Sequence, residues 1–538
     1  MAGKASYPSP PASLSHHRIE VLLSALRRGS GGDSADGSGG GSGDDGETEV
    51  RMPFSGEVLL RLPNTTVGQV AEAARLARTA QKQWAATSIH VRAAALLRWH
   101  DAVLARADEL CDVIQAESGK ARGDAFEEVA DIANTLRYYG LSAAKVLAPR
   151  RRHGVFPLLT RTVELRHPYG LVGIISPWNY PLTLAAGDAI PALVAGNAVL
   201  HKPDSQTALT TLLIREIALA AGIPAGVWQV VVGDGATVGP AVIDAADHVV
   251  FTGSTATGRR VAEQAGRRLV RADLELGGKN AMIVCADARL AAAVEGAVRG
   301  SFSSAGQLCL SMERIYVHRN IADEFTKRFA AAARRVKLGA GYDFRSEMGS
   351  LVNEAQLAKT RSHIDDAVAH GATVLAGGTH RPDLGPYFFE PTVLADVPET
   401  AACFGEETFG PVVSIYPVAS DEEAIEKANA SAYGLNASVF SRSAAHARSV
   451  ARRLAAGTVN INESYAAAWG SVDSPMGGVK ASGVGRRHGA EGLLASTWAQ
   501  TIAAQRFWPV GEFGPLRGRR YQTFMTAALR ALKMLRRR

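Results

Sequence analysis

The stretch GLVGIISPW, residues 170–178, decides the fold: it is a short Val- and Ile-rich run that stops at polar and aromatic residues. Three similar runs follow it, NAVLHKP (197–203), WQVVVGDG (228–235) and HVVFTGS (248–254). Helical segments such as 209–221 lie between them. Near-continuous apolar strands that alternate with helices are typical of a parallel sheet buried on both faces.

A second series of apolar runs occupies the C-terminal half, at 280–287, 314–318, 373–376 and 411–417. Helical periodicity marks three segments upstream of both series, 67–86, 91–107 and 125–147. We therefore expect an α/β protein with two parallel-sheet domains in tandem. The boundary is expected near Gly277 and Gly278, where the second series begins.

The composition is that of an ordinary globular protein, with 46% hydrophobic and 21% charged residues in 538. The net charge of +7 comes from the segment 517–538, which holds eight basic residues and no acid. The rest of the chain is nearly neutral, so we expect no nucleic-acid partner. No stretch approaches the ~18 apolar residues of a membrane span, and no signal peptide is recognisable.

Cysteine usage indicates a reducing compartment, so we expect a cytoplasmic protein. The four cysteines are Cys111, Cys285, Cys309 and Cys403, and no two of them form a CxxC pair. This spacing predicts neither a disulfide framework nor a zinc cluster, and we expect no metal.

The two ends of the chain differ from its body. Residues 30–47, SGGDSADGSGGGSGDDGE, contain almost nothing apolar, so burial cannot offset their ordering entropy. We expect residues 1–48 to be a disordered extension, apart from a short helix at 16–28. The tail 517–538 predicts a basic amphipathic helix, with Phe524 and Leu532 on one face and Arg530 and Lys533 on the other. Such a helix suits peripheral contact with an anionic membrane, or packing on the protein's own surface or on a neighbouring subunit.

Polar and glycine-rich residues follow the predicted strands, where open parallel sheets bind nucleotides. The glycine clusters GDGATVG (233–239) and GSTATG (253–258) do not match GxGxxG, but each ends an apolar run and opens a helix. Backbone N–H groups at a helix start suit a pyrophosphate, although tight turns alone would also explain the glycines.

A glutamate and a cysteine stand out 34 residues apart. Glu275 lies between leucines in LELGGKN (274–280), although Glu is rarely buried unless it is paired or functional. Cys309 follows in GQLC (306–309). Judged alone, Cys309 is better explained as an apolar filler than as a nucleophile, because buried thiols are common in protein interiors.

Seven motifs carry a resemblance that covers about residues 50–510. They are SPWNYP (176–181), KPDSQT (202–207), FTGSTATG (251–258), ELGGKN (275–280), GQLC (306–309), EETFGPVV (406–413) and PMGGVKASGVGR (475–486). In this order and spacing, the chain resembles the NAD(P)-dependent aldehyde dehydrogenase superfamily. The residues within these motifs are most similar to those of the succinate-semialdehyde dehydrogenase branch.

The resemblance implies an oxidation of an aldehyde to the acid. Cys309 would attack the carbonyl as a thiolate, and the Asn179 amide with the Cys309 N–H would hold the oxyanion. Hydride transfer would leave a thioester, and Glu275 would activate the water that hydrolyses it. An acylating enzyme that uses coenzyme A would not need Glu275, and a non-enzymatic protein would not need any of the three.

The resemblance also implies the cofactor contacts. Lys202 and Glu407 resemble ribose ligands, and Trp178, Asn179, Gly253, Ser254, Leu276 and Phe409 resemble residues that line the cofactor channel. Ser205 stands where many NAD-preferring relatives carry Glu, which would repel a 2′-phosphate. We therefore predict NADP, with NAD possible, although Asp204 adds a negative charge next to Ser205.

The predicted substrate is succinate semialdehyde, with one reservation. The branch usually binds the substrate carboxylate with arginine, but the helix after WNYP has Asp188 and no Arg, and Arg314 adjoins Glu313. The segment YAAAW (465–469) would suit a less polar aliphatic or aromatic aldehyde. Ser311 replaces the second cysteine of some relatives, so we expect no redox switch.

The family layout predicts where the domains lie. The cofactor domain is expected at 49–147 and 168–276, and the catalytic domain at 277–489. Bridging strands are expected at 148–167 and 490–510, in a homodimer or homotetramer.

Overall fold

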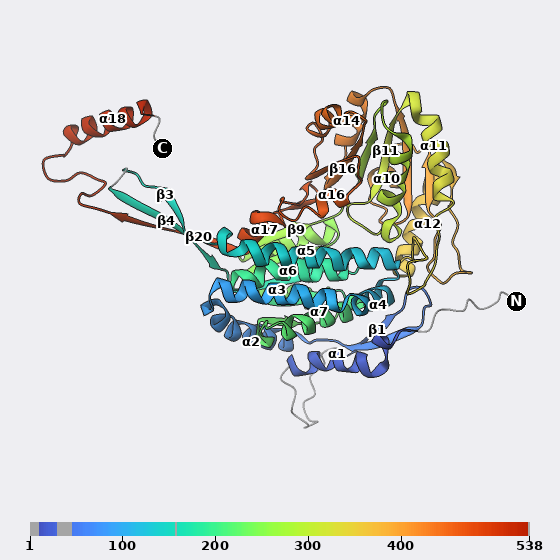
Figure 1. Ribbon diagram of the computed structural model, residues 1–538, viewed down its shortest axis with the longest axis horizontal. Helices are drawn as coiled ribbons and strands as arrows, with labels where there is room; N and C mark the ends of the chain where they lie inside the picture. The colour runs from blue at the N-terminus through green and yellow to red at the C-terminus, as the bar shows by residue number, and fades with distance from the viewer. Residues whose placement is uncertain (1–9, 30–45, 157–158, 536–538) are drawn as a thin grey trace.

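The computed structural model describes residues 10–29, 46–156 and 159–535 (Figure 1). Its first domain is built on a six-stranded sheet in the order β19-β9-β8-β5-β6-β7. The strands are β5 (Leu171–Ser176), β6 (Ala198–Pro203), β7 (Trp228–Val230), β8 (His248–Thr252), β9 (Arg271–Glu275) and β19 (Gly483–Val484). All neighbours are parallel except β19, which pairs antiparallel with β9.

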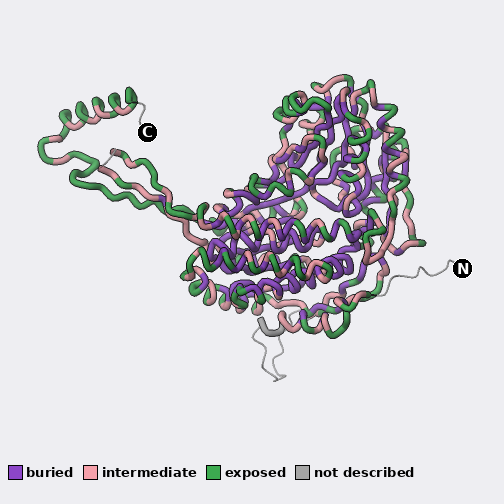
Figure 2. The backbone as a smooth tube through the Cα atoms, in the orientation of Figure 1, coloured by how far each residue is buried: buried purple, intermediate pink, exposed green. Residues whose placement is uncertain are grey.

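Helices cover this sheet and contribute most of its core. They are α2 (Val67–Ala86), α3 (Ile89–Ala105), α4 (Ala107–Ser118), α5 (Arg122–Val146), α6 (Pro181–Ala195), α7 (Ala208–Ala220), α8 (Val238–Ala245) and α9 (Thr255–Arg267). β5 and β6 are almost wholly buried along their length, as a sheet with helices on both faces requires. Figure 2 shows this region as the largest buried part of the body.

The second domain has a seven-stranded sheet in the order β12-β13-β14-β11-β10-β16-β17. Its strands are β10 (Asn280–Val284), β11 (Met312–His318), β12 (Thr373–Ala376), β13 (Thr392–Ala395), β14 (Val412–Val418), β16 (Asn436–Phe440) and β17 (Thr458–Ile461). Only the β12–β13 pair is antiparallel. The helices are α10 (Leu290–Phe302), α11 (Arg319–Ala333), α12 (Glu354–Ala369), α13 (Ala402–Gly405), α14 (Asp421–Asn429), α15 (Ala444–Ala451) and α16 (Ala466–Trp469). The predicted pair of parallel-sheet α/β domains is confirmed.

A three-stranded arm extends from the body (Figure 1). It consists of β3 (Arg150–His153), β4 (Thr160–Pro168) and β20 (Thr497–Gln505), and it leads to α18 (Arg519–Met534). The bridging β element is therefore confirmed. No residue of α18 is buried, as Figure 2 shows. Within the described ranges, no helix has the length and apolarity needed to cross a membrane.

The prediction that residues 1–48 are disordered is wrong for residues 10–29. Helix α1 (His16–Gly29) packs against the first domain and buries Ile19, Leu22 and Leu23. Arg18 anchors it through ion pairs to Glu109 and Glu216, so apolar and charged contacts together offset the ordering entropy. The helix predicted at 16–28 is confirmed, and the linker prediction for 30–45 lies outside the described residues. Beyond the linker, β1 (Glu47–Arg51) pairs with β2 (Val58–Pro63).

Two predicted boundaries also need correction. The segment 483–495 was placed in the catalytic domain or the bridge, but β19 pairs with β9, and α17 (Gly489–Ala495) packs on α5 and α6 of the first domain. The edge of β9 needs a partner for its backbone groups, and β19 supplies one. Only from 497 onward does the chain enter the arm.

Candidate active site

The candidate residues follow strands of the first sheet at one edge. Trp178 and Asn179 follow β5, Lys202 lies near the end of β6, Gly253 follows β8, and Glu275 ends β9. Because these strands are parallel, their carboxyl ends meet along the same edge. The fold therefore brings together residues that are up to 97 positions apart in the sequence.

Cys309 lies on a tight turn that precedes β11. Ser304 and Ala305 have positive φ angles of 49° and 55°, and Gly306 continues the left-handed conformation at 70°. A Cβ atom at Gly306 would lie 2.1 Å from the Gly410 carbonyl oxygen, so only glycine fits there. Asn280 stabilises the turn by donating from Nδ2 to the Cys309 carbonyl at 2.7 Å. The turn leaves Cys309 partly exposed, while the other three cysteines are buried.

The surroundings of Cys309 keep its thiol protonated. Burial, with the negative charges of Glu407 and Glu275, raises the pKa of Cys309 to about 12, against a lowering by Arg487. A nucleophilic thiolate therefore needs an additional positive charge or the neutralisation of a carboxylate.

Glu275 is 8% exposed, and burial raises its pKa to about 7. Arg487 lowers this pKa, and Asp188 raises it. The Arg487 guanidinium donates to the Asp188 carboxylate at 3.1 Å and to the Thr252 hydroxyl at 2.9 Å. Gly477 leaves room for the Glu275 carboxylate, since a Cβ atom at Gly477 would lie 2.7 Å from Glu275 Oε1. A carboxyl group that is half ionised near neutral pH is suited to general-base chemistry.

Asn179 is positioned by contacts at both ends. Its side-chain Nδ2 donates to the Gln307 carbonyl at 2.9 Å, two residues before Cys309. Its own carbonyl accepts from Lys120 Nζ at 2.8 Å, and Lys120 is paired with the buried Glu128 at 2.5 Å. Glu128 also accepts from the backbone N–H groups of Leu182 and Thr183, which fixes the start of α6.

Glu407 and Phe409 approach the site from the second domain. Glu407 accepts from the Gly278 N–H at 2.8 Å, and burial followed by the charge of Glu313 raises its pKa to about 7. Phe409 has a positive φ of 57°, and its ring meets that of Trp178 edge-on at 5.6 Å. These contacts bring residues of both domains together over the strand ends.

A separate group lies at the ends of β6 and β7. Ser205 Oγ donates to the Gly233 carbonyl at 3.2 Å, and Asp204 accepts from the Gln206 N–H. Lys202 is buried and donates to the Pro203 carbonyl at 3.2 Å. Burial lowers its pKa, while Asp204 and Asp234 act in the opposite direction.

The remaining predicted cofactor residues lie after β8 and β9. Ser254 caps α9 by accepting from the Thr257 N–H at 3.3 Å, with Gly253 just before it. Leu276 packs on Gly258 in the apolar cluster under α9. A helix start next to a glycine is a place where backbone N–H groups suit a phosphate.

Apolar and aromatic side chains surround Cys309 on its other side. This cluster consists of Tyr180, Leu184, Leu308, Leu310, Leu435, Tyr465, Trp469 and Met476. Trp469 packs its ring on Tyr180 at 5.7 Å, and the Tyr465 hydroxyl donates to Glu127 at 3.0 Å. The surface that leads to the thiol is therefore largely apolar.

Arg314 does not belong to this surface. Its guanidinium is buried and donates to the backbone carbonyl groups of Lys279 and Ala428 and to the Tyr316 hydroxyl. Its neighbour Glu313 pairs with Lys279. Ser311 donates to the Gly300 carbonyl, which makes it a structural hydroxyl.

Three residues of the site were missed by sequence reasoning: Lys120, Glu128 and Arg487. Lys120 and Glu128 lie in the helical region before the sheet, and no local pattern indicates their contacts. Arg487 directly follows the motif PMGGVKASGVGR (475–486), so extending that motif by one residue would have included it.

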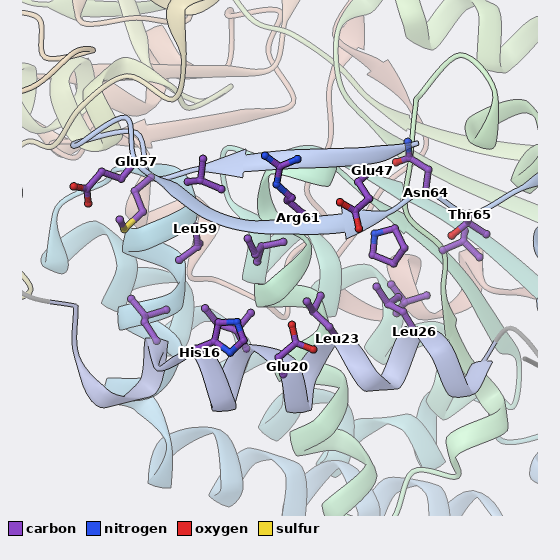
Figure 3. Close-up of a pocket in the computed structure, with 18 of the residues that line it drawn as sticks. His16, Glu20, Leu23, Leu26, Glu47, Glu57, Leu59, Arg61, Asn64 and Thr65 are labelled. Atoms are coloured by element: carbon purple, nitrogen blue, oxygen red, sulfur yellow. The ribbon is translucent and has the colours of Figure 1, made fainter. Parts of the chain in front are cut away.

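A separate cavity lies between α1, the β1–β2 hairpin and the end of β7 (Figure 3). Its volume is about 880 Å³, and its walls mix leucines with Glu20, Glu47 and Arg61. None of the predicted catalytic or cofactor residues lines it.

Comparisons with known proteins show the family of this chain. Residues 41–502 match the model of the aldehyde dehydrogenase family. A protein of Mycolicibacterium smegmatis named "Putative succinate-semialdehyde dehydrogenase [NADP(+)]" is 51% identical over 490 residues, which cover 90% of this chain and 94% of the relative. The mitochondrial succinate-semialdehyde dehydrogenase of Oryza sativa is 34% identical and matches 84% of this chain and 85% of its own.

Solved structures of aldehyde dehydrogenases also resemble this chain. Betaine aldehyde dehydrogenase from Staphylococcus aureus in complex with NAD+ superposes with a TM-score of 0.83, at 32% identity, over 89% of this chain and 98% of that one. An NADP-dependent enzyme of E. coli has a TM-score of 0.82 at 32% identity, over 86% and 95% of the two chains. The chain belongs to the aldehyde dehydrogenase family.

Proposed function

We propose that the protein oxidises succinate semialdehyde to succinate with NADP. The observation that carries this proposal is the convergence of Cys309, Glu275 and Asn179 over the strand ends of the first sheet. The names of the 51% identical relatives supply the substrate and the cofactor. We further infer that the first domain binds the cofactor and the second supplies the cysteine.

Cys309 acts as the nucleophile in this proposal. Its sulfur attacks the aldehyde carbon, and the Asn179 amide and the Cys309 N–H donate to the resulting oxyanion. Bound NADP supplies the hydride acceptor, and the acyl group stays on Cys309 as a thioester. Because burial and the charges of Glu407 and Glu275 raise the pKa of Cys309, the positively charged nicotinamide ring of bound NADP would favour the thiolate.

Glu275 acts as the general base for hydrolysis. It takes a proton from a water molecule, whose oxygen attacks the thioester carbon, and the Cys309 sulfur leaves. The pKa of about 7 leaves roughly half of the carboxyl groups ionised at neutral pH. An acylating enzyme would pass the acyl group to coenzyme A instead, and coenzyme-A-dependent turnover would contradict the proposed role.

Ser205 and Lys202 support NADP. Neither carries a negative charge: Lys202 lies near the end of β6, and Ser205 follows that strand and donates to the Gly233 carbonyl. A serine hydroxyl can donate to a 2′-phosphate, and a lysine adds positive charge. Asp204 is occupied as a cap for Gln206, which directs its carboxylate to the backbone.

A less polar aliphatic or aromatic aldehyde is the second candidate substrate. Two observations favour it: the aromatic and aliphatic cluster beside Cys309, and the burial of Arg314 away from that cluster. Asp188 and Arg487 are paired with each other. The test is kcat/KM for succinate semialdehyde against hexanal and benzaldehyde, with both cofactors. Preference for succinate semialdehyde and NADP supports the proposal, and a tenfold preference for an uncharged aldehyde or for NAD contradicts it.

The arm and α18 are proposed to make the contacts between molecules. Trp498 and Ile502 on β20 are 43% and 50% exposed, which suits packing of the arm on a second copy in a dimer or tetramer. Helix α18 has no buried residue and exposes Phe524, Leu529 and basic residues, and we propose that it binds an anionic membrane peripherally.

A further inference from the structure

A cysteine, an aspartate and a histidine meet in the second domain, although they lie far apart in the sequence. They are Cys285, Asp421 and His446, and their donor atoms all lie within 4.8 Å of one another. Motif spacing could not indicate this group, because three different crossovers bring its members together. The spacing argument against a zinc cluster therefore does not apply to it.

The topology explains why the three residues meet. Cys285 directly follows β10, Asp421 begins α14 after β14, and His446 lies in α15 after β16. These strands are parallel members of one sheet, so their carboxyl ends share an edge. Cys309 lies at the opposite edge, before β11, and five-residue strands place the two edges roughly 15 Å apart. The group is thus separate from the candidate active site.

The contacts within the group place three potential metal ligands close together. His446 Nε2 lies 2.6 Å from Asp421 Oδ2. On the other side of the ring, Nδ1 lies 3.5 Å from Ser441 Oγ and 3.9 Å from Asp287 Oδ1. Asp287 Oδ1 is buried and has no hydrogen-bond partner, while Oδ2 accepts from Ser441. A carboxylate behind the second ring nitrogen is the arrangement that orients metal-binding histidines.

Burial and electrostatics also favour a bound cation. Cys285 is fully buried, whereas Asp421 and His446 have side chains 22% and 39% exposed, so the site opens to solvent on one side. A divalent cation would offset the negative charges of both carboxylates, Asp421 and Asp287.

We propose that Cys285 Sγ, an Asp421 carboxylate oxygen and His446 Nε2 bind a zinc ion, with Asp287 behind the histidine. Thiolate, imidazole and carboxylate are the ligands that zinc prefers, and solvent would complete a tetrahedral set. Zinc bonds of about 2.0–2.3 Å require ligand separations of roughly 3.3–3.8 Å, so shifts of about 1 Å close the site. The ion would tie α14 and α15 to the end of β10.

The test uses the full-length Cys309→Ser protein, so that the candidate catalytic thiol cannot bind metal. Cobalt is titrated as a spectroscopic probe for zinc, and the near-ultraviolet thiolate-to-cobalt charge-transfer band is recorded. We expect one equivalent to bind with this band. The band should disappear in Cys309→Ser/Cys285→Ser and persist in Cys309→Ser/Cys403→Ser, which removes a different buried thiol of the same domain.

Zinc affinity is then measured by competition with a chromophoric chelator. His446→Ala is expected to weaken binding at least tenfold, and Asp287→Asn by about tenfold as an outer partner. Circular dichroism checks that each variant is folded, which is expected because serine is nearly isosteric with Cys285 and His446 is partly exposed. Absence of the cobalt band, its survival without Cys285, or unchanged affinity in His446→Ala would overturn the proposal.

Discussion

Glu275 has to be ionised to activate water, and its buried surroundings decide at which pH that occurs. Its pKa is raised to about 7 chiefly by burial, while Arg487 holds it down. A group that works in its deprotonated form loses activity as the pH falls below its pKa. Thioester hydrolysis should therefore slow below about pH 7 and become independent of this group above it.

The role of Arg487 can be tested through this pH profile. In Arg487→Gln the positive charge near Glu275 is lost, so the acid limb of the kcat profile should move upward by about one pH unit. Arg487→Lys keeps the charge and should leave the limb close to its wild-type position. An unshifted limb in Arg487→Gln would contradict the assignment of that limb to Glu275.

Cofactor choice is expected to depend on Ser205. Ser205→Glu places a carboxylate where the 2′-phosphate of NADP is proposed to bind, and like charges repel. The ratio of kcat/KM for NADP to that for NAD should fall at least tenfold. Ser205→Ala, which removes only the hydroxyl donor, should lower the ratio less. Equal ratios in Ser205→Glu and wild type would place the adenosine ribose elsewhere.

Short sequence motifs identified the candidate catalytic residues. Cys309, Glu275 and Asn179 each stand in a short motif, and the fold places Glu275 and Asn179 at strand ends of the first sheet and Cys309 on the turn before β11. The directions of Arg314 and Lys120 were not predictable, because their partners lie 35 and 59 positions away. Side-chain orientation depends on such distant packing, which no local pattern records.

At the scale of elements, α1 was only partly anticipated. Its helical period is visible in the sequence, but its docking depends on Arg18 meeting Glu109 and Glu216 across 91 and 198 positions. The glycine-rich composition of residues 30–47 therefore led to a prediction of disorder that is wrong for the helix before them. The strand order was also not predictable from local sequence, because β19 pairs with β9 although the two strands lie more than 200 positions apart in the chain.

The ion pairs of Arg18 should contribute measurably to stability. Arg18→Ala removes three hydrogen bonds to partly exposed carboxylates, which is expected to cost about 1 kcal/mol. Calorimetry should show a Tm lower by a few degrees. Arg328→Ala, which removes an exposed pair with Glu324 within α11, should leave Tm nearly unchanged. Equal Tm values for Arg18→Ala and wild type would show that the Arg18 ion pairs do not help to hold α1 on the first domain.

Helix α18 is expected to carry the membrane contact. Co-sedimentation with vesicles rich in phosphatidylserine should recover the full chain and lose the form truncated after residue 516. Because the attraction is electrostatic, recovery should fall at high salt and with vesicles of phosphatidylcholine alone. Equal recovery of the two forms would contradict the proposal.

At the scale of the whole molecule, the site depends on two domains meeting. Glu275 and Asn179 come from the first sheet, and Cys309, Glu407 and Phe409 approach from the second. The alternation of strands and helices predicted both sheets, because burial on two faces leaves a clear apolar pattern. How the sheets face each other follows from contacts such as Glu407 with Gly278, which become visible only in the structure.

The central claim is that Cys309 carries the acyl group and Glu275 activates the water that removes it. Rapid mixing of Glu275→Gln with NADP and the best aldehyde substrate tests it most directly. The account predicts a burst of one NADPH per active site followed by stalled turnover, with the acyl mass on the Cys309 peptide and no burst in Cys309→Ser. Steady turnover of Glu275→Gln at the wild-type rate, or an acyl adduct on another residue, would contradict it.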